Sequence, residues 1–245
     1  MALASGQPTH LEALMRWSRP GAGLVPPGEF ISVAEETGLI VPLGEWMLRR
    51  ATLDCAGVQA VRPGLGVAVN VSAHQLNSGD FLPTVRAALA DAQLAPELLT
   101  LEITESALLH NTDAVLRHLE EIRALGTRIS LDDFGTGYSS LTYLHRLPIN
   151  ELKIDQSFVQ TLGNDGSDRI LLNTIIQLGR AYGLTVVAEG IDSEQKLRVL
   201  NKLGCRYGQG FLFARPAPLA EVEVGLHALS GLDRGALPRP GRTRR

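Results

Sequence analysis

The stretch Thr127–Asp133 reads TRISLDD, and FGTGYSS follows it directly. Thr127–Leu131 has the short β-branched and apolar character of a strand, and two adjacent acids come immediately after it. The glycines of the following segment can adopt a positive φ, which permits an irregular turn at that point. This pattern predicts a strand that delivers two carboxylates to the edge of a sheet.

Similar short runs recur on both sides of this stretch, and longer helical patterns separate them. The other expected strands are Leu11–Trp17, Leu65–Val71, Leu99–Thr104, Glu151–Ile154, Thr185–Ala188 and Gly204–Phe211. Their mostly apolar character suits parallel strands that are covered on both faces. Alternating strands and helices predict an α/β fold with a parallel sheet, either open or closed. The set is one strand short of a closed (β/α)8 barrel.

Composition and charge exclude several classes of protein. The 245 residues contain 23 Lys and Arg against 26 Asp and Glu, which gives a formal net charge of −3. No broad cationic surface for bulk nucleic-acid binding is therefore expected. No apolar run is long enough for a membrane helix, and the first residues do not resemble a signal peptide. Cys55 and Cys205 fit no metal-ligand spacing, so we expect a cytoplasmic protein.

Polar side chains recur where the expected strands end. They are Glu12, Arg16, Asn70, Glu102, Asp132, Asp133, Lys153, Asp155 and Glu189. The C-terminal ends of the strands in a parallel barrel open onto one face, where active sites lie. A single acid in such a place is more often a helix N-cap or a loop residue. Capping alone does not account for the same pattern on six consecutive strands.

A cluster of carboxylates needs cations, because the like charges otherwise repel one another. Oxygen ligands without Cys or grouped His favour Mg²⁺, Mn²⁺ or Ca²⁺. Asp132 and Asp133 can face the same site only where the strand ends or bulges. Such a set suits two metal ions that promote in-line displacement at phosphorus. Lys153 would hold the attacking water or neutralise phosphoryl oxygens, and Arg16 would clamp a phosphate.

Two residues keep alternative interpretations at this point. Lys153 is also compatible with a role as the buried partner of an acid, and the two roles can coexist. Glu105 follows Glu102 by three residues. It would either accept hydrogen bonds from the segment Gly135–Ser140 or serve as an acid at a helix N-terminus.

Several motifs resemble those of the EAL-domain phosphodiesterases, bacterial enzymes that hydrolyse cyclic di-GMP to linear pGpG. In family order they are EALMRW, VAVNVSA, LEITES, ISLDDFGTGYSSL, LKIDQSF, VVAEG and GQGFLFARP. DDFGTGYSS with an upstream EITES is highly specific, whereas EAL alone is weak. The resemblance implies a TIM-like (β/α) barrel of EAL type that lacks its first strand.

The resemblance also implies roles for the matching positions. Divalent metal ions, two Mg²⁺ or Mn²⁺, would be held by Glu12, Asn70, Glu102, Asp132, Asp133 and Glu189. The residues assigned to catalysis are Lys153 on the water, Glu189, and Glu105 as the anchor of the loop 133–140. The substrate contacts would be Leu14, Arg16, Asp155 and Gln209. The implied partners are cyclic di-GMP, a second copy in a homodimer, and a regulatory domain or partner outside this chain.

The N-terminus departs from the family pattern. In the family, a strand with a Tyr-Gln-Pro-like motif precedes the EAL strand, whereas here Gln7-Pro8 stands four residues before Glu12. We therefore expect a truncated lead at 1–10 and an EAL-type phosphodiesterase domain at 11–228. A disordered tail at 229–245, with five arginines, would follow. The strands on both sides of the missing one would each have an unpaired edge.

Three functions are compatible with these patterns. The complete acidic set favours a metal-dependent, cyclic-guanylate-specific phosphodiesterase in bacterial second-messenger signalling. The missing strand favours a catalytically impaired module that binds cyclic di-GMP or another protein. A two-metal hydrolase of a different phosphodiester is the third, because only the family resemblance names the base.

Overall fold

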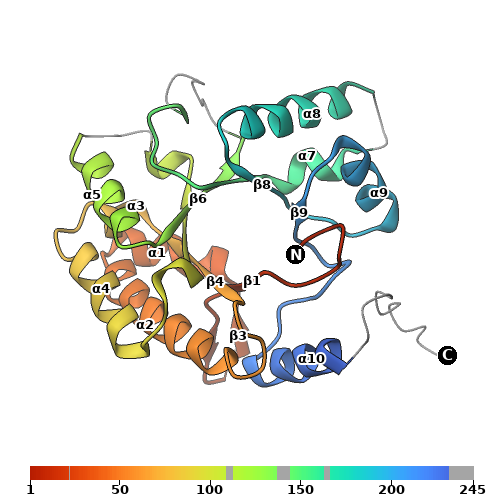
Figure 1. The fold of residues 1–245 in the computed structure, drawn as a ribbon. Coiled ribbons are helices and arrows are strands. Elements are labelled where there is room, and N and C mark those ends of the chain that lie inside the picture. The colour runs from red at the N-terminus through yellow and green to blue at the C-terminus, as the bar shows by residue number, and fades with distance from the viewer. Residues whose placement is uncertain (22, 109–112, 137–143, 163–165, 232–245) are drawn as a thin grey trace.

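The parallel sheet is the centre of the fold. A computed structural model describes residues 1–21, 23–108, 113–136, 144–162 and 166–231. Within them, seven parallel strands pair in the order β1-β4-β5-β6-β7-β8-β9 (Figure 1). Their bounds are His10–Ala13, Gly66–Val71, Leu99–Thr104, Arg128–Phe134, Glu151–Ile154, Thr185–Ala188 and Tyr207–Gly208. The sheet is open between β1 and β9, which confirms the expected TIM-like α/β fold of EAL type, one strand short of closure.

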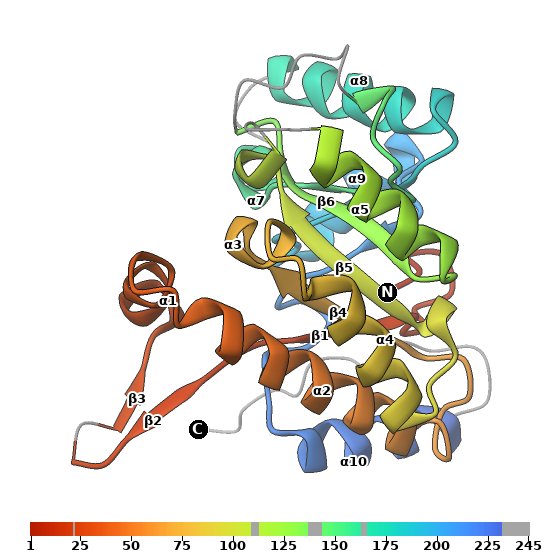
Figure 2. The same ribbon diagram turned by 90° about the vertical axis from the view of Figure 1, so that its left-hand side faces the viewer.

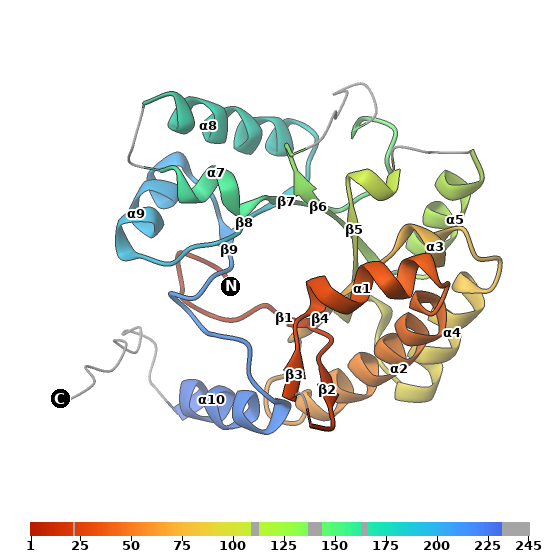
Figure 3. The ribbon, with the colours of Figure 1, turned by 180° about the vertical axis from the view of Figure 1, so that it is seen from behind.

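Helices surround this curved sheet, and most of them cover its outside (Figures 1 and 3). They are α1 (Pro27–Glu36), α2 (Ile40–Val58), α3 (Ala73–Leu76), α4 (Phe81–Ala92), α5 (Asp113–Ala124), α7 (Gln156–Gln160), α8 (Gly166–Ala181), α9 (Glu194–Leu203) and α10 (Leu219–Gly231). Two short 3₁₀ turns, η1 (Pro96–Leu98) and η2 (Ser106–Leu108), precede and follow β5. Pro27 opens α1 as expected, because proline lacks the N–H that the first helical turn leaves unpaired.

β5 separates an apolar face from a polar one. Leu99, Leu101 and Ile103 are fully buried in the hydrophobic core. Thr100 and Glu102 alternate with them and therefore point to the other face, the inside of the barrel. Truncating Leu101 to alanine would cost about 2–5 kcal/mol of stability, because it opens a cavity in a packed core. This alternation places polar groups inside the barrel.

The segment after β1 differs from the expectation. β1 ends at Ala13, and Trp17–Arg19 (β2) pairs antiparallel with Gly23–Val25 (β3) instead of continuing the first strand. This hairpin and α1 project away from the barrel (Figure 2). The expected strand Leu11–Trp17 is therefore wrong in its extent. Strands of three residues are too short to show an alternation of apolar and polar residues, so the sequence did not predict the hairpin.

The first residues lie between β9 and β1 (Figure 3). Ala2 forms antiparallel bridges with Gln7 and with Tyr207, across a turn in which Gly6 has a φ of 65°. The N–H of Leu3 donates to the carbonyl oxygen of Arg206 at 2.8 Å, and the Leu3 side chain is buried. The edge of β9 is thus partly paired, which corrects the expectation of an unpaired edge there. The turn at Gly6 leads the chain from this bridge back to β1, a connection that the sequence did not predict.

The C-terminal part contributes one further helix. Leu226 of α10 packs in a small core with Val58 and Leu65. Residues 229–231, expected in the disordered tail, belong to α10, and residues 232–245 lie outside the described residues. No helix in the described ranges is long and apolar enough to cross a membrane.

Candidate active site

Lys153 of β7 lies at the centre of the carboxylates that the strand ends supply. Its Nζ is 2.9 Å from Glu102 Oε1 on β5 and 2.8 Å from Glu189 Oε1, directly after β8. A third acid, Asp132 on β6, has its Oδ1 at 3.3 Å from the same Nζ. Lys153 and Glu102 are almost fully buried. The structure therefore brings together residues from four neighbouring strands that are far apart in sequence.

A second group faces this cluster from the other end of the sheet. Asn70 Nδ2 on β4 donates a hydrogen bond of 3.0 Å to Glu12 Oε1 on β1. The amide Nε2 of Gln209, beside β9, donates to the other oxygen of Glu12. Strand register places Asn70 next to Glu102, so the two groups are continuous across β4 and β5. Glu12 thus links the two outermost strands of the open sheet.

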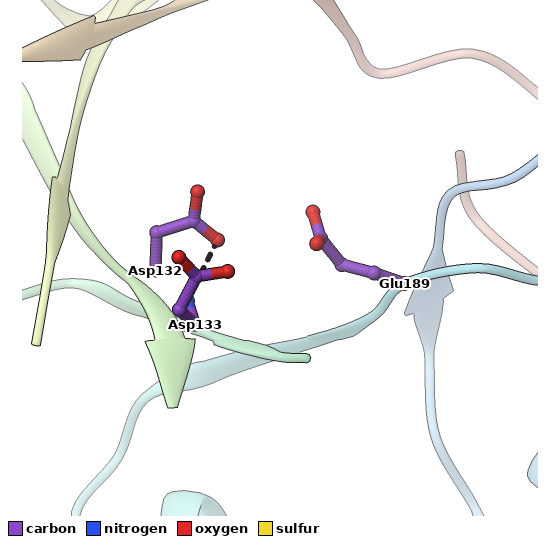
Figure 4. Close-up of side chains that lie close together, drawn as sticks. All are labelled: Asp132, Asp133 and Glu189. Atoms are coloured by element: carbon purple, nitrogen blue, oxygen red, sulfur yellow. Dashed lines mark hydrogen bonds between the residues drawn. The ribbon is translucent and has the colours of Figure 1, made fainter. Parts of the chain in front are cut away.

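An irregular end of β6 aims two adjacent acids at one site. The register between β6 and β7 shifts between Leu131 and Phe134, and Asp133 has a φ of 55° in the left-handed region. Asp132 Oδ1 accepts a hydrogen bond of 2.9 Å from the Asp133 N–H, which holds this turn. Oxygens of Asp132, Asp133 and Glu189 lie within 4.8 Å of one another (Figure 4). The bulge expected from the sequence is therefore present.

Glu105 holds this irregular end through two hydrogen bonds. Its Oε2 accepts a hydrogen bond of 3.2 Å from the N–H of Gly135. Its own N–H donates to the carbonyl oxygen of Asp132 at 3.2 Å. Glu105 thus contacts the segment after β6 as the first of its two interpretations anticipated. Residues 137–140, the rest of the expected loop, lie outside the described residues.

The buried charges determine which protonation state each group prefers. Burial raises the pKa of Glu102 to about 8, against the opposing effect of Lys153. Burial also raises the pKa of Glu189 to about 7. Burial lowers the pKa of Lys153, but the carboxylates of Glu102, Glu189 and Asp132 outweigh it and raise the pKa above its ordinary value. Lys153 is therefore a fixed ammonium, suited to donating hydrogen bonds rather than to accepting a proton.

The donor set fits divalent metal ions. It consists of carboxylate oxygens and one amide, the hard ligands that Mg²⁺ and Mn²⁺ prefer. Glu102 Oε2 is buried and has no hydrogen-bond partner in the described part of the chain. An unpaired buried carboxylate oxygen is costly, and a coordinated cation would satisfy it. The Asp132, Asp133 and Glu189 cluster is consistent with one such metal position.

The expected substrate residues differ in their surroundings. Leu14 and Arg16 lie in the connection between β1 and β2 and are exposed. The Arg16 guanidinium donates to the carbonyl oxygen of its neighbour Met15 at 2.8 Å. Asp155 caps α7, since its Oδ1 accepts from the Ser157 N–H at 2.9 Å. The capping geometry leaves the second carboxylate oxygen of Asp155 for other contacts.

Asp192 and Ser193 stand together before α9, and only the serine caps that helix. Asp192 forms an ion pair of 2.9 Å with Lys196, whereas Ser193 is the N-cap of α9. Sequence reasoning missed the polar residues on the lower interior of the barrel, among them Thr100, Arg128 and Glu151. Polar residues alternate with apolar ones along β5, β6 and β7, and this alternation could have identified them.

Comparisons with known proteins agree with this geometry. Residues 1–216 match the EAL domain family model. The chain is 45% identical over 216 residues to the bifunctional diguanylate cyclase/cyclic di-GMP phosphodiesterase MucR of Pseudomonas aeruginosa, covering 86% of this chain and 31% of MucR. It is 44% identical to the cyclic di-GMP phosphodiesterase NbdA of the same organism, covering 93% of this chain and 29% of NbdA. The chain thus spans under a third of the length of these relatives.

Solved structures extend the similarity to three dimensions. The structure described as PaMucR phosphodiesterase in complex with c-di-GMP superposes with a TM-score of 0.86 at 43% identity, covering 90% of both chains. The EAL enzyme Bd1971, bound to cAMP and cyclic di-GMP, gives a TM-score of 0.88 at 33% identity, covering 92% of this chain and 62% of that one. On these grounds the chain belongs to the EAL-domain cyclic di-GMP phosphodiesterase family.

Proposed function

We propose that this chain is a metal-dependent, cyclic-guanylate-specific phosphodiesterase that hydrolyses cyclic di-GMP to linear pGpG. The observation that carries this proposal is the Lys153 ammonium, which lies within 3.3 Å of carboxylates from β5, β6 and the end of β8. The choice of substrate rests on the relatives, of which NbdA is named a cyclic di-GMP phosphodiesterase. The PaMucR structure, a complex with that dinucleotide, supports the same choice.

Two sets of side chains would hold two Mg²⁺ or Mn²⁺ ions. Asp132, Asp133 and Glu189 form the set with the closest oxygens. The other set would be Glu12, Asn70 and Glu102, of which the last has the unpaired oxygen Oε2 among the described residues. When bound, the metal ions would activate water and neutralise charge on the phosphoryl oxygens.

The residues of the chain itself would perform the remaining tasks. The water oxygen attacks phosphorus, the bond from phosphorus to the ribose 3′ oxygen breaks, and that oxygen takes up a proton. Lys153, fixed as an ammonium, would orient the water and stabilise negative charge on the phosphoryl oxygens. Glu105 would keep the end of β6 in place through its hydrogen bond with Gly135.

Substrate positioning would fall to the residues around the cluster. The exposed Arg16 guanidinium would clamp a phosphate by its planar fork. Leu14, Asp155 and Gln209 would contact the rest of the dinucleotide, as the family resemblance implies. The same resemblance supports a homodimer and regulation by a domain or partner outside this chain, and the two cysteines support a cytoplasmic location.

The open sheet favours one alternative function. A gap between β1 and β9 would let Glu12 and Gln209 shift. The chain would then bind cyclic di-GMP, or another protein, without hydrolysing the nucleotide. Hydrolysis depends on positioning within fractions of an ångström, whereas binding tolerates more displacement.

Chromatography after incubation with cyclic di-GMP separates these functions. We expect pGpG in the presence of Mg²⁺ or Mn²⁺, little with Ca²⁺, whose bonds are longer and more variable, and none with a chelator. Saturable binding of cyclic di-GMP without formation of pGpG would reject the phosphodiesterase and favour the binding module. Equal rates with chelator and with Mg²⁺ would rule out the metal mechanism.

A further inference from the structure

A polar cavity lies inside the barrel, beneath the acidic cluster. Its volume is about 480 Å³, and its lining comes from all seven strands of the parallel sheet, the first residues and the turn after α2. Glu102 and Lys153 line its upper end, and Pro63 and Gly64, both exposed, line its lower end. Barrels of this architecture are usually filled by packed side chains. Here small residues such as Ala68 and Thr100 leave the interior open.

Two residues that line this cavity carry hydrogen-bond donors without a partner among the described residues. Thr100 Oγ1 and Arg128 Nε are buried and lack a hydrogen-bond partner within the described ranges. Thr100 is only 1% exposed, and strand register places it directly opposite Arg128 on the neighbouring strand. Each buried donor left unpaired costs about 1–3 kcal/mol. Neither atom exposes surface to the cavity in this conformation, so a bound acceptor would remove this cost once both side chains turn toward it.

The charges at the lower end favour an anionic acceptor. Arg62 hydrogen-bonds the neutral side-chain amide of Gln7. Arg128 Nη2 is 3.9 Å from Glu151 Oε2, while Ser130 Oγ donates to the other oxygen of that acid at 3.0 Å. Two guanidinium groups and one carboxylate therefore line this end of the cavity. The nearby imidazole of His10 is neutral at pH 7, because burial lowers its pKa to about 4.

We propose that the lower end of this cavity, between Arg62, Thr100 and Arg128, binds a small oxyanion such as a phosphate group. Guanidinium groups match oxyanions through paired, charge-assisted hydrogen bonds, and the threonine hydroxyl adds a further donor. The cavity lies within the size range of small-ligand sites, about 300–1,000 Å³. The site is distinct from the acidic cluster, because it occupies the opposite ends of the same strands.

The phosphate group could belong to free phosphate or to a mononucleotide, and calorimetry distinguishes the two sources. The full chain is titrated with inorganic phosphate and, separately, with 5′-GMP, at constant ionic strength and with a chelator that removes metal ions. Saturable binding at one site is expected in at least one arm. Equal affinity in both arms indicates a site for the anion alone, and tighter binding of 5′-GMP indicates a site for the whole nucleotide.

Variants locate the binding within the molecule. Arg62→Gln and Thr100→Val should each weaken phosphate binding by about tenfold, the loss of one good hydrogen bond. Arg62 belongs to the partly exposed turn after α2, so its substitution should leave folding intact. Arg50→Gln is the matched control, since Arg50 pairs with Asp54 on the outside of α2. Its affinity for phosphate should equal that of the unmodified chain.

Three outcomes would overturn the proposal. They are heats that do not saturate in either arm, unchanged affinity in both the Arg62→Gln and Thr100→Val variants, and loss of binding in Asp132→Asn. The last result would assign the anion to the acidic cluster instead of the lower cavity. None of these readouts requires hydrolysis of cyclic di-GMP, so the inference stands or falls separately from the proposed function.

Discussion

The side of the barrel from β4 to β8 and the seam between β9 and β1 are built very differently. β4 and β5 share five paired positions, and β5 and β6 share five, all backed by core residues. At the seam, β9 shares two paired positions with β8, and the first residues supply single bridges. Lys153, Glu102 and Asp132 belong to the continuous side, whereas Glu12 and Gln209 face each other across the seam. The continuous side therefore fixes the centre of the cluster, and the seam determines how precisely its outer ligands are held.

Removing a carboxylate from the continuous side should have the largest effect on activity. We expect Asp132→Ala to lower turnover of cyclic di-GMP by at least about 1,000-fold, or about 4 kcal/mol of transition-state stabilisation. The fold should persist, because Asp132 lies at the mouth and its loss relieves repulsion with Glu189. The pGpG assay and a thermal melt measure the two effects. Asp54→Ala, a change of the same kind on the surface of α2, is the control.

Glu12→Ala tests the same point at the seam and should also abolish hydrolysis. Turnover like that of the unmodified chain in Glu12→Ala, with loss in Asp132→Ala, would show that only the continuous side carries the chemistry. Unchanged turnover in both variants would reject the proposed metal ligands.

Removing the Lys153 ammonium from the centre of the acidic cluster should mainly reduce stability. Lys153→Met leaves Glu102 and Glu189 without the ammonium at 2.9 and 2.8 Å. Breaking a buried ion pair from one side typically costs about 3–5 kcal/mol, so the free energy of unfolding in denaturant should fall by that order. Mg²⁺ should restore part of the loss in this variant, because the metal replaces the missing positive charge. A variant as stable as the original without metal would contradict the central role of Lys153.

Reinforcing the seam should have a smaller effect in the opposite direction. An extended segment added before Met1, taken from the relative MucR, should pair along β9 and β1. Each buried backbone group that becomes paired contributes about 1–3 kcal/mol, and each kcal/mol raises the melting temperature by about 2–4 °C in a chain of this size. Turnover should rise too, because Glu12 and Gln209 would be held more firmly.

The control for this experiment is an extension of equal length made of glycine and serine. If the short chain, the MucR-type extension and the control had the same melting temperature and turnover, the seam would be irrelevant to stability and activity.

The smallest expected effect concerns pH and His10, which lies on β1 at the seam. Burial lowers the pKa of His10 to about 4, with Arg128 adding to the effect. In the unfolded chain the pKa is about 6.5, so the unfolded state binds more protons between these values and stability rises with pH. The contribution of His10 is complete above about pH 6.5 and is lost progressively as pH falls toward about 4.

Denaturant unfolding measures this dependence. Between pH 7.5 and pH 5.5 we expect His10 to account for a loss of about 1 kcal/mol in the free energy of unfolding. His10→Gln should remove that part of the pH dependence. A slope that is identical in the two proteins would show that His10 is not buried against the barrel interior in solution.

The amino-acid sequence by itself determined the class of fold and the members of the cluster. Apolar runs such as Leu99–Thr104 and Thr185–Ala188 specify strands locally, because side-chain burial follows the period of the strand. Acids such as Glu102 and Asp132, at or near the ends of such runs, had to meet at one edge, because parallel strands share a direction. The family motifs then named the substrate, which the polar residues alone left open.

Only the tertiary structure decided the contacts that depend on which strand lies beside which. The position of Lys153 among three acids, and the bond from Gln209 to Glu12, join residues up to 197 positions apart. The pairing of Ala2 with Tyr207 and the short hairpin at Trp17–Arg19 likewise had no periodic signal. The physical reason is that a local pattern fixes which face of a strand is buried, whereas the assembly of the whole sheet fixes which strand lies beside it.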